Sequence, residues 1–176
     1  NLTGLWILQE CQRQWRDEGR THDIVELLRL AEAAPSTGIV IDTEDPRFAV
    51  PDAMVDRVRE VIDEAGTGLP TLDEGAIVRV VLESLATRYA DGVAALDALT
   101  GARVPQLNLV GGGSRNALLC QLTADAVGMP VVAGPVEASV LGSMLAQLEV
   151  MGHLAPADRN AVIGATASTV RYDPAR

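Results

Sequence analysis

The stretch LNLVGGGSRN, residues 107–116, decides the fold. It joins a short apolar run, which is typical of a buried strand, to three adjacent glycines and then to polar residues that open a helical pattern. A strand that turns directly into a helix is the first half of a crossover between parallel strands. The stretch therefore predicts an α/β domain.

The residues after this stretch repeat the same order. We expect a helix over 114–127 that closes at Gly128, a second strand over 130–133, a Gly-Pro turn, and a helix over 137–150. Strand, helix, strand and helix in this order predict two parallel strands with helical crossovers. The tail after these elements has a weaker pattern, which indicates one short helix.

The residues before this stretch are mainly helical. Apolar residues at spacings of three and four predict helices over residues 2–15, 24–31, 53–64 and 73–99. Thr71 and Glu74 have the capping-box spacing, and Gly101 follows the longest helix. The run Ile39–Ile41 predicts a short buried strand. Together these elements indicate one helix-rich α/β domain.

Composition excludes several classes of function. The chain has 176 residues, of which 48% are hydrophobic and 22% charged, and a net charge of −10. An acidic chain lacks the clustered basic face that nucleic acids require, so we expect no nucleic-acid partner. No apolar run reaches the ~18 residues of a membrane span, so we expect no membrane partner. All fourteen basic residues are Arg, which excludes a P-loop lysine within the chain.

The cysteines and histidines offer no chemistry of their own. Cys11 and Cys120 lie far apart in helical patterns, and we expect both to be buried thiols in a reducing cytoplasm. His22 and His153 have no partner at metal-ligand spacing. Because the chain begins with Asn1 inside a helical pattern, we expect it to be part of a longer protein.

The glycine turn is the best candidate for a ligand site. Glycines have no Cβ, so a flat ring or a phosphate can lie against their backbone. The helix start beyond them offers free N–H groups and a positive dipole end. Ser114, Arg115 and Asn116 add side-chain donors, and Asn116 can pair with an adenine edge. A tight strand-to-helix turn without a ligand remains the alternative.

The same residues carry a resemblance to a known family. Residues 109–116 resemble the adenosine-binding turn of the FGGY carbohydrate kinases. Further matches follow in the family's order, and two segments near the start of the chain also match; the most similar branch is rhamnulokinase. The matching residues are Gln121, Ala124-Asp125, Gly128, 130–132, 133–139, 4–6 and 45–48. The resemblance covers roughly residues 1–152.

The resemblance implies a fold and an activity. The fold would be an actin-like ATPase (ribonuclease-H-like) domain, the C-terminal half of a two-domain sugar kinase, without its first strands. Residues 1–152 would form the nucleotide-binding domain and 153–176 its tail. Rhamnulokinases transfer the γ-phosphate of ATP to the 1-hydroxyl of L-rhamnulose with Mg²⁺. In that family the general base precedes the position of Asn1, so we expect this chain to be inactive alone.

The resemblance also assigns site residues. Asn1 falls at a sugar-contacting position, Gln9 at a nucleotide-contacting position, and Gly112 where the backbone meets the adenosine. The argument from the turn adds Gly111, Gly113 and Asn116 to the ATP-binding residues. An N-cap role for Asn1 and an exposed helical position for Gln9 are the alternatives.

Two other functions stay open. The chain is compatible with another FGGY kinase that acts on xylulose, fuculose or glycerol, since sugar specificity resides mostly in the other half of such enzymes. It is also compatible with a non-catalytic domain that binds a partner through its acidic surface. An exposed sheet edge would favour a homodimer.

Overall fold

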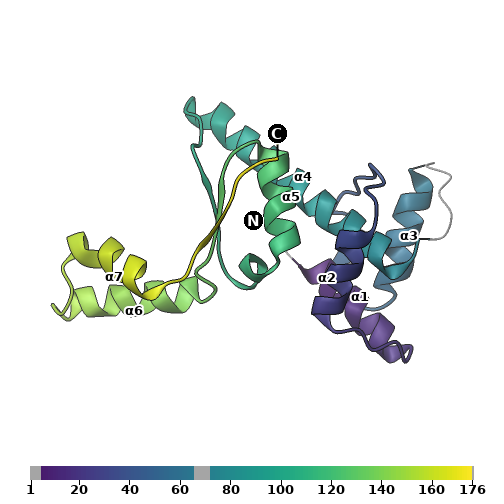
Figure 1. Ribbon diagram of the computed structural model, residues 1–176, viewed down its shortest axis with the longest axis horizontal. Helices are drawn as coiled ribbons and strands as arrows, with labels where there is room; N and C mark the ends of the chain where they lie inside the picture. Colours follow the sequence, from purple (N-terminus) through teal and green to yellow (C-terminus); the bar gives the residue numbers. More distant parts are fainter. Residues whose placement is uncertain (1–4, 66–71, 176) are drawn as a thin grey trace. The chain divides into compact units, whose positions relative to one another are not determined.

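The computed structural model describes residues 5–65 and 72–175 (Figure 1). The chain divides into two compact units, Asn1–Arg103 and Val104–Arg176, and each is described by itself. The helix-rich α/β fold that the sequence predicts is confirmed. The predicted division of the domain at residue 152 remains a prediction.

The first unit is helical. Its elements are α1 (Trp6–Asp17), α2 (Ile24–Ala33), a 3₁₀ turn η1 (Pro46–Ala49), α3 (Met54–Glu64) and α4 (Glu74–Thr100). These helices match the four predicted ones to within a few residues, although α1 is described only from Trp6. The buried side chains are mainly aliphatic, with two large aromatic residues among them. The largest are Trp15, Phe48, Ile7, Leu8, Leu27, Met54, Ile77, Leu82 and Leu85.

The longest helix has well-defined ends. Asp73 caps α4 by accepting a hydrogen bond from the Ala76 N–H at 2.8 Å, and Gly101 closes it with φ +66°. Thr71 lies outside the described residues, but the predicted Thr71–Glu74 capping box is wrong, because Glu74 is the first residue of α4 and Asp73 is its cap. A Cβ added to Gly75 would lie 2.8 Å from the carbonyl oxygen of Leu30, so α2 and α4 approach each other closely at this glycine.

The predicted strand at Ile39–Ile41 is wrong. The segment is extended, and Ile39 and Ile41 are both buried, but it does not belong to the sheet. The Ile41 N–H instead donates to the Ser84 hydroxyl oxygen of α4 at 3.0 Å, and that hydroxyl donates to Val80 O at 2.7 Å. A backbone N–H of this apolar run therefore bonds to a helix side chain instead of a neighbouring strand. Periodicity alone does not distinguish these two arrangements.

The turn that leads into α3 is strained. Asp52 and Ala53 are not glycines, yet they have φ values of +74° and +47°. Left-handed backbone costs about 1–2 kcal/mol for an L-residue, and less for Asp than for Ala. Such a turn persists only where surrounding contacts hold it.

The second unit contains the sheet. Its elements are β1 (Leu107–Leu109), η2 (Gly112–Arg115), α5 (Ala117–Val127), β2 (Val131–Ala133), α6 (Ala138–Val150), η3 (Pro156–Asp158), α7 (Arg159–Thr166) and β3 (Val170–Tyr172). The sheet order is β1-β2-β3, with β1 parallel to β2 and β3 antiparallel to β2. Leu107 pairs with Val131, and Leu109 with Ala133. The predicted pair of parallel strands is confirmed.

Strand β3 was not predicted, because it is only three residues long and mostly exposed. Two side chains of α5 fix the segment that follows it. The Gln121 amide donates to Asp173 O at 2.9 Å, and Asp125 accepts from the Ala175 N–H at 2.7 Å. The end of the chain is therefore attached to α5 by contacts between residues about fifty positions apart.

Helices α6 and α7 lie away from α5 in Figure 1, and an ion pair between Glu149 and Arg159 joins them. Leu145 is the buried residue of α6, whereas Val140 and Met144 are half exposed or more. None of the helices in the described parts of the chain is both long and apolar enough to cross a membrane.

Both cysteines are buried, as predicted from the sequence. Burial raises the pKa of Cys11 to about 12 and the pKa of Cys120 to about 11. Each is a thiol rather than a thiolate at neutral pH. Neither is therefore an activated nucleophile.

Candidate functional site

The candidate site lies where the two parallel strands end. The carboxyl ends of parallel strands meet at one edge of a sheet, and ligands of open α/β sheets bind beyond that edge. Here the Gly134 N–H donates to Leu109 O at 2.8 Å, and the Gly111 N–H donates to Pro135 O at 3.2 Å. These two bonds hold the turn after β1 beside the turn after β2.

Gly111 gives the first turn its shape. It has φ +81° and ψ −164°, a backbone conformation that only glycine adopts readily. Its carbonyl oxygen accepts both the Ser114 N–H at 3.1 Å and the Ser114 hydroxyl at 2.7 Å. The Ser114 hydroxyl therefore donates within the turn, and it is not the free donor that the sequence suggested.

The other two glycines leave an open surface. A Cβ built on Gly112 meets no atom within 4 Å, and one built on Gly113 meets a Leu109 methyl carbon at 3.5 Å. Within the described residues, the N–H groups of Gly112 and Gly113 have no hydrogen-bond acceptor. A flat or anionic ligand can approach both N–H groups without displacing a side chain. The Arg115 side chain is exposed next to them.

Asn116 has a structural role and one unused donor. It is 4% exposed, and its side-chain oxygen caps α5 by accepting the Leu119 N–H at 3.0 Å. This bond fixes the orientation of the amide, because the flipped amide would direct its NH2 group toward the Leu119 N–H. The amide nitrogen is buried and has no partner within the described residues. A buried donor without a partner costs about 1–3 kcal/mol.

The capping bond limits the hydrogen bonds that Asn116 can make to an adenine. Its oxygen is occupied, so a paired contact that both donates and accepts is not available. The remaining donor, the amide nitrogen, has almost no exposed surface. The capping role follows from its position before the helix.

The other two predicted residues belong to the first unit. Gln9 lies on the exposed side of α1, opposite the buried Leu8 and Cys11, and its side chain has no hydrogen bond within the described residues. It is free to contact a ligand. Asn1 lies outside the described residues. The glycine turn and Gln9 are therefore two separately described parts of the predicted site.

The sequence analysis missed the second turn as a part of the site. Gly134 has φ +106°, and a Cβ on it would lie 2.6 Å from the carbonyl oxygen of Ser168, so only glycine fits there. The Gly134–Pro135 peptide bond is cis. The sequence does contain a signal for this turn, because Gly-Pro follows directly after the second parallel strand. The turns after two adjacent parallel strands lie next to each other.

Residues 5–65 and 72–175 contain no group of three or more His, Cys, Asp or Glu side chains that could hold a metal ion. The described residues therefore form no protein cage for Mg²⁺. The open surface at Gly112 and Gly113, in contrast, fits a flat or anionic ligand.

Comparison with known proteins agrees with this geometry. The family model for the C-terminal domain of the FGGY carbohydrate kinases matches residues 1–149. The chain belongs to the FGGY family of carbohydrate kinases. The crystal structure of xylulose kinase from Rhodospirillum rubrum resembles it with a TM-score of 0.63 and 22% identity, over 99% of this chain and 34% of that one.

This FGGY kinase domain therefore spans about a third of the length of that xylulose kinase. The likeness to the solved kinase concerns the fold. The family match ends at residue 149, at the end of α6, so it includes both parallel strands, the glycine turn and Gln9.

The dual role of Asn116 can be tested by unfolding. Asn116→Ala and Asn116→Ser both remove the unpaired amide nitrogen, but only Ser keeps a side-chain oxygen for the Leu119 N–H, and Ser and Asn are about equally good caps. We expect Asn116→Ser to be more stable than Asn116→Ala by about 1 kcal/mol in urea denaturation at pH 7. Equal stabilities of the two variants would contradict the capping role.

Proposed function

We propose that this chain is the ATP-binding part of a cytoplasmic sugar kinase, and that the kinase transfers the γ-phosphate of ATP to the 1-hydroxyl of L-rhamnulose. Membership of the FGGY family supports a carbohydrate kinase. The choice of ATP as the ligand of the glycine turn, and of rhamnulose as the sugar, is our proposal.

The observation that carries the nucleotide proposal is the surface formed by the glycine turn. Within the described residues the backbone N–H groups of Gly112 and Gly113 have no acceptor, and a Cβ built on Gly112 meets no atom within 4 Å. The glycines leave room for a flat ring, while the N–H donors suit its ring nitrogens or the oxygens of the ribose and phosphates. Gln9, exposed and unpaired on α1, is proposed as a second contact to the nucleotide.

In this proposal the chain contributes positioning rather than proton transfer. Phosphoryl transfer depends on holding the nucleotide in line with the acceptor hydroxyl, on a metal, and on a residue that orients or deprotonates the hydroxyl. Five carboxylates, Glu10, Glu18, Glu26, Asp45 and Glu149, have their pKa lowered by hydrogen bonds from arginines. Carboxylates held ionised in this way serve as ion-pair partners and are weak general bases.

The sugar is proposed from the residues after β2. The segment 133–139, with the Gly134–Pro135 turn, resembles that of rhamnulokinases more closely than that of other branches. Xylulose is the main alternative, because the solved structure reported above is a xylulose kinase. Fuculose and glycerol are further alternatives. Asn1 is proposed as the sugar contact of this chain.

Replacing Gly112 tests the nucleotide proposal directly. A side chain fits there without meeting another protein atom, so Gly112→Val fills the space proposed for the nucleotide while leaving the fold intact. We expect ADP to bind this variant at least about tenfold more weakly than the wild-type chain, a loss of about 1.4 kcal/mol. Isothermal titration calorimetry measures the difference.

Gly164→Val is the matched control for this experiment. Gly164 lies in α7, and a Cβ built there also meets no atom within 4 Å. This variant is expected to bind ADP like the wild-type chain. Equal ADP affinities for Gly112→Val and the wild type would contradict the proposed site.

The proposed sugar is tested with the kinase that contains this chain. We expect kcat/KM for L-rhamnulose to exceed the values for D-xylulose, L-fuculose and glycerol by at least about tenfold, the ratio that 1.4 kcal/mol of transition-state discrimination gives. A coupled assay of ADP release measures it. A preference for xylulose would replace the proposed substrate, and sugar phosphorylation by the 176-residue chain alone would refute the proposal that it is inactive by itself.

We also propose that the chain forms a homodimer through the outer edge of β1. Within the described residues β1 pairs with β2 alone, and ladder alternation directs the N–H of Asn108 away from β2. Unpaired strand edges favour pairing with another chain.

Asn108→Pro tests this dimer, because it removes the outward N–H without removing a bond to β2. We expect sedimentation velocity to find a concentration-dependent dimer for the wild-type chain and a monomer for the variant. A wild-type chain that stays monomeric at all concentrations would exclude the dimer.

A further inference from the structure

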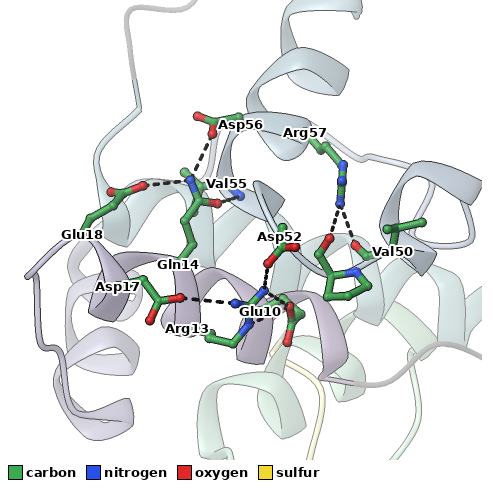
Figure 2. A network of polar contacts seen from close by, with 11 residues as sticks. Glu10, Arg13, Gln14, Asp17, Glu18, Val50, Asp52, Val55, Asp56 and Arg57 are labelled. Atoms are coloured by element: carbon green, nitrogen blue, oxygen red, sulfur yellow. Dashed lines mark hydrogen bonds and ion pairs between the residues drawn. The ribbon is translucent and has the colours of Figure 1, made fainter.

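The strained turn before α3 contacts the helix that carries Gln9. Asp52 and Ala53 have positive φ, and Arg57 of α3 donates to the carbonyl oxygens of Val50 at 2.6 Å and Pro51 at 3.4 Å (Figure 2). These two hydrogen bonds from α3 hold the turn in place. Its other contacts come from α1.

Arg13 of α1 makes the first of these contacts. Its guanidinium donates to Asp52 at 2.7 Å, and within α1 it donates to Glu10 at 2.8 and 3.0 Å and to Asp17 at 3.2 Å (Figure 2). Glu10 is buried, and the hydrogen bond from Arg13 lowers its pKa, so it stays ionised at neutral pH. The Arg13 guanidinium thus links Asp52 to two carboxylates of its own helix.

Gln14 makes the second contact. Its side-chain oxygen accepts the Val55 N–H at 2.8 Å, and its amide donates to Asp56 at 3.0 Å and to Glu18 at 2.9 Å. Ala53, the N-cap residue of α3, has no side chain that can cap the helix. A side chain of α1 therefore supplies the cap that the sequence of α3 lacks.

A third contact lies at the other end of α1. The Trp6 indole N–H donates to Phe48 O at 2.9 Å, and Phe48 belongs to η1, a few residues before the strained turn. Residues 48–55 thus hold α1 at Trp6 and again at Arg13 and Gln14. Gln9 lies between these two points, one helical turn before Arg13, and its side chain makes no hydrogen bond with the residues that the structure describes.

We propose that residues 48–55 act as a clamp that sets the rotation and position of α1, with Arg13 and Asp52 as positioning residues for Gln9. The clamp rests on the proposed function, in which Gln9 contacts the nucleotide. It explains why two non-glycine residues keep a left-handed backbone at an exposed turn. This conformation brings the Asp52 carboxylate to Arg13 and the Val55 N–H to Gln14.

Two substitutions at Asp52 separate the contact from the backbone shape. Asp52→Gly keeps a residue that favours positive φ and removes the acceptor for Arg13. Asp52→Asn also tolerates positive φ and keeps a side-chain oxygen for Arg13. We expect ADP to bind Asp52→Gly about fivefold more weakly, with an unchanged or higher unfolding midpoint, and to bind Asp52→Asn nearly as well as the wild type. Titration calorimetry and thermal unfolding of the 176-residue chain measure both properties.

The decisive comparison is made with Gln9→Ala. If Asp52 acts through Gln9, then Asp52→Gly weakens ADP binding in the wild-type chain but has no further effect in the Gln9→Ala chain. The same fivefold loss in both chains would overturn the clamp. The clamp would also be overturned if Asp52→Gly bound ADP normally while Gln9→Ala bound it more weakly. In that case the proposed contact between Gln9 and the nucleotide would stand. If Gln9→Ala binds ADP like the wild type, that contact itself is wrong and the clamp falls with it.

Discussion

Pairing of the backbone beyond the ends of two parallel strands is the constraint on which the candidate site depends. Strands β1 and β2 are only three residues long, so their ladder alone would leave the following turns free to diverge. The bonds from Gly134 to Leu109 and from Gly111 to Pro135 continue the pairing into the turns. Both glycines have positive φ, and Gly134 has no room for a side chain, so the turns require glycine for this geometry.

The rest of the glycine turn follows from that constraint. Once Gly111 is fixed, its carbonyl oxygen accepts two donors from Ser114, and the chain enters α5 with Asn116 as the cap. The Ser114 hydroxyl and the Asn116 side-chain oxygen therefore make internal hydrogen bonds and are not available to a ligand. The groups left over are the backbone N–H of Gly112 and Gly113 and the amide nitrogen of Asn116. Of these groups, the two glycine N–H groups lie at the open surface, whereas the Asn116 nitrogen is buried.

In the first unit, side chains rather than glycines hold a turn in place. Helix α3 begins at a residue that cannot cap it, and the turn before it is strained. Gln14 and Arg13 of α1 compensate for both defects. Helices α1 and α3 therefore depend on each other through a short polar seam. Trp15 of α1 and Val58 of α3 are both fully buried, so each helix also contributes to the apolar core.

The sequence by itself determined the features that have local causes. Helical periodicity and the terminating glycines at 101 and 128 predict the main helices, and the run into three glycines predicts the strand, the turn and the family. The tertiary structure decided what depends on distant partners. The Ile39–Ile41 segment bonds to Ser84 instead of a strand, and β3 joins the sheet. Hydrogen bonds between residues forty to fifty positions apart leave no periodic trace in the sequence, so only the folded chain reveals them.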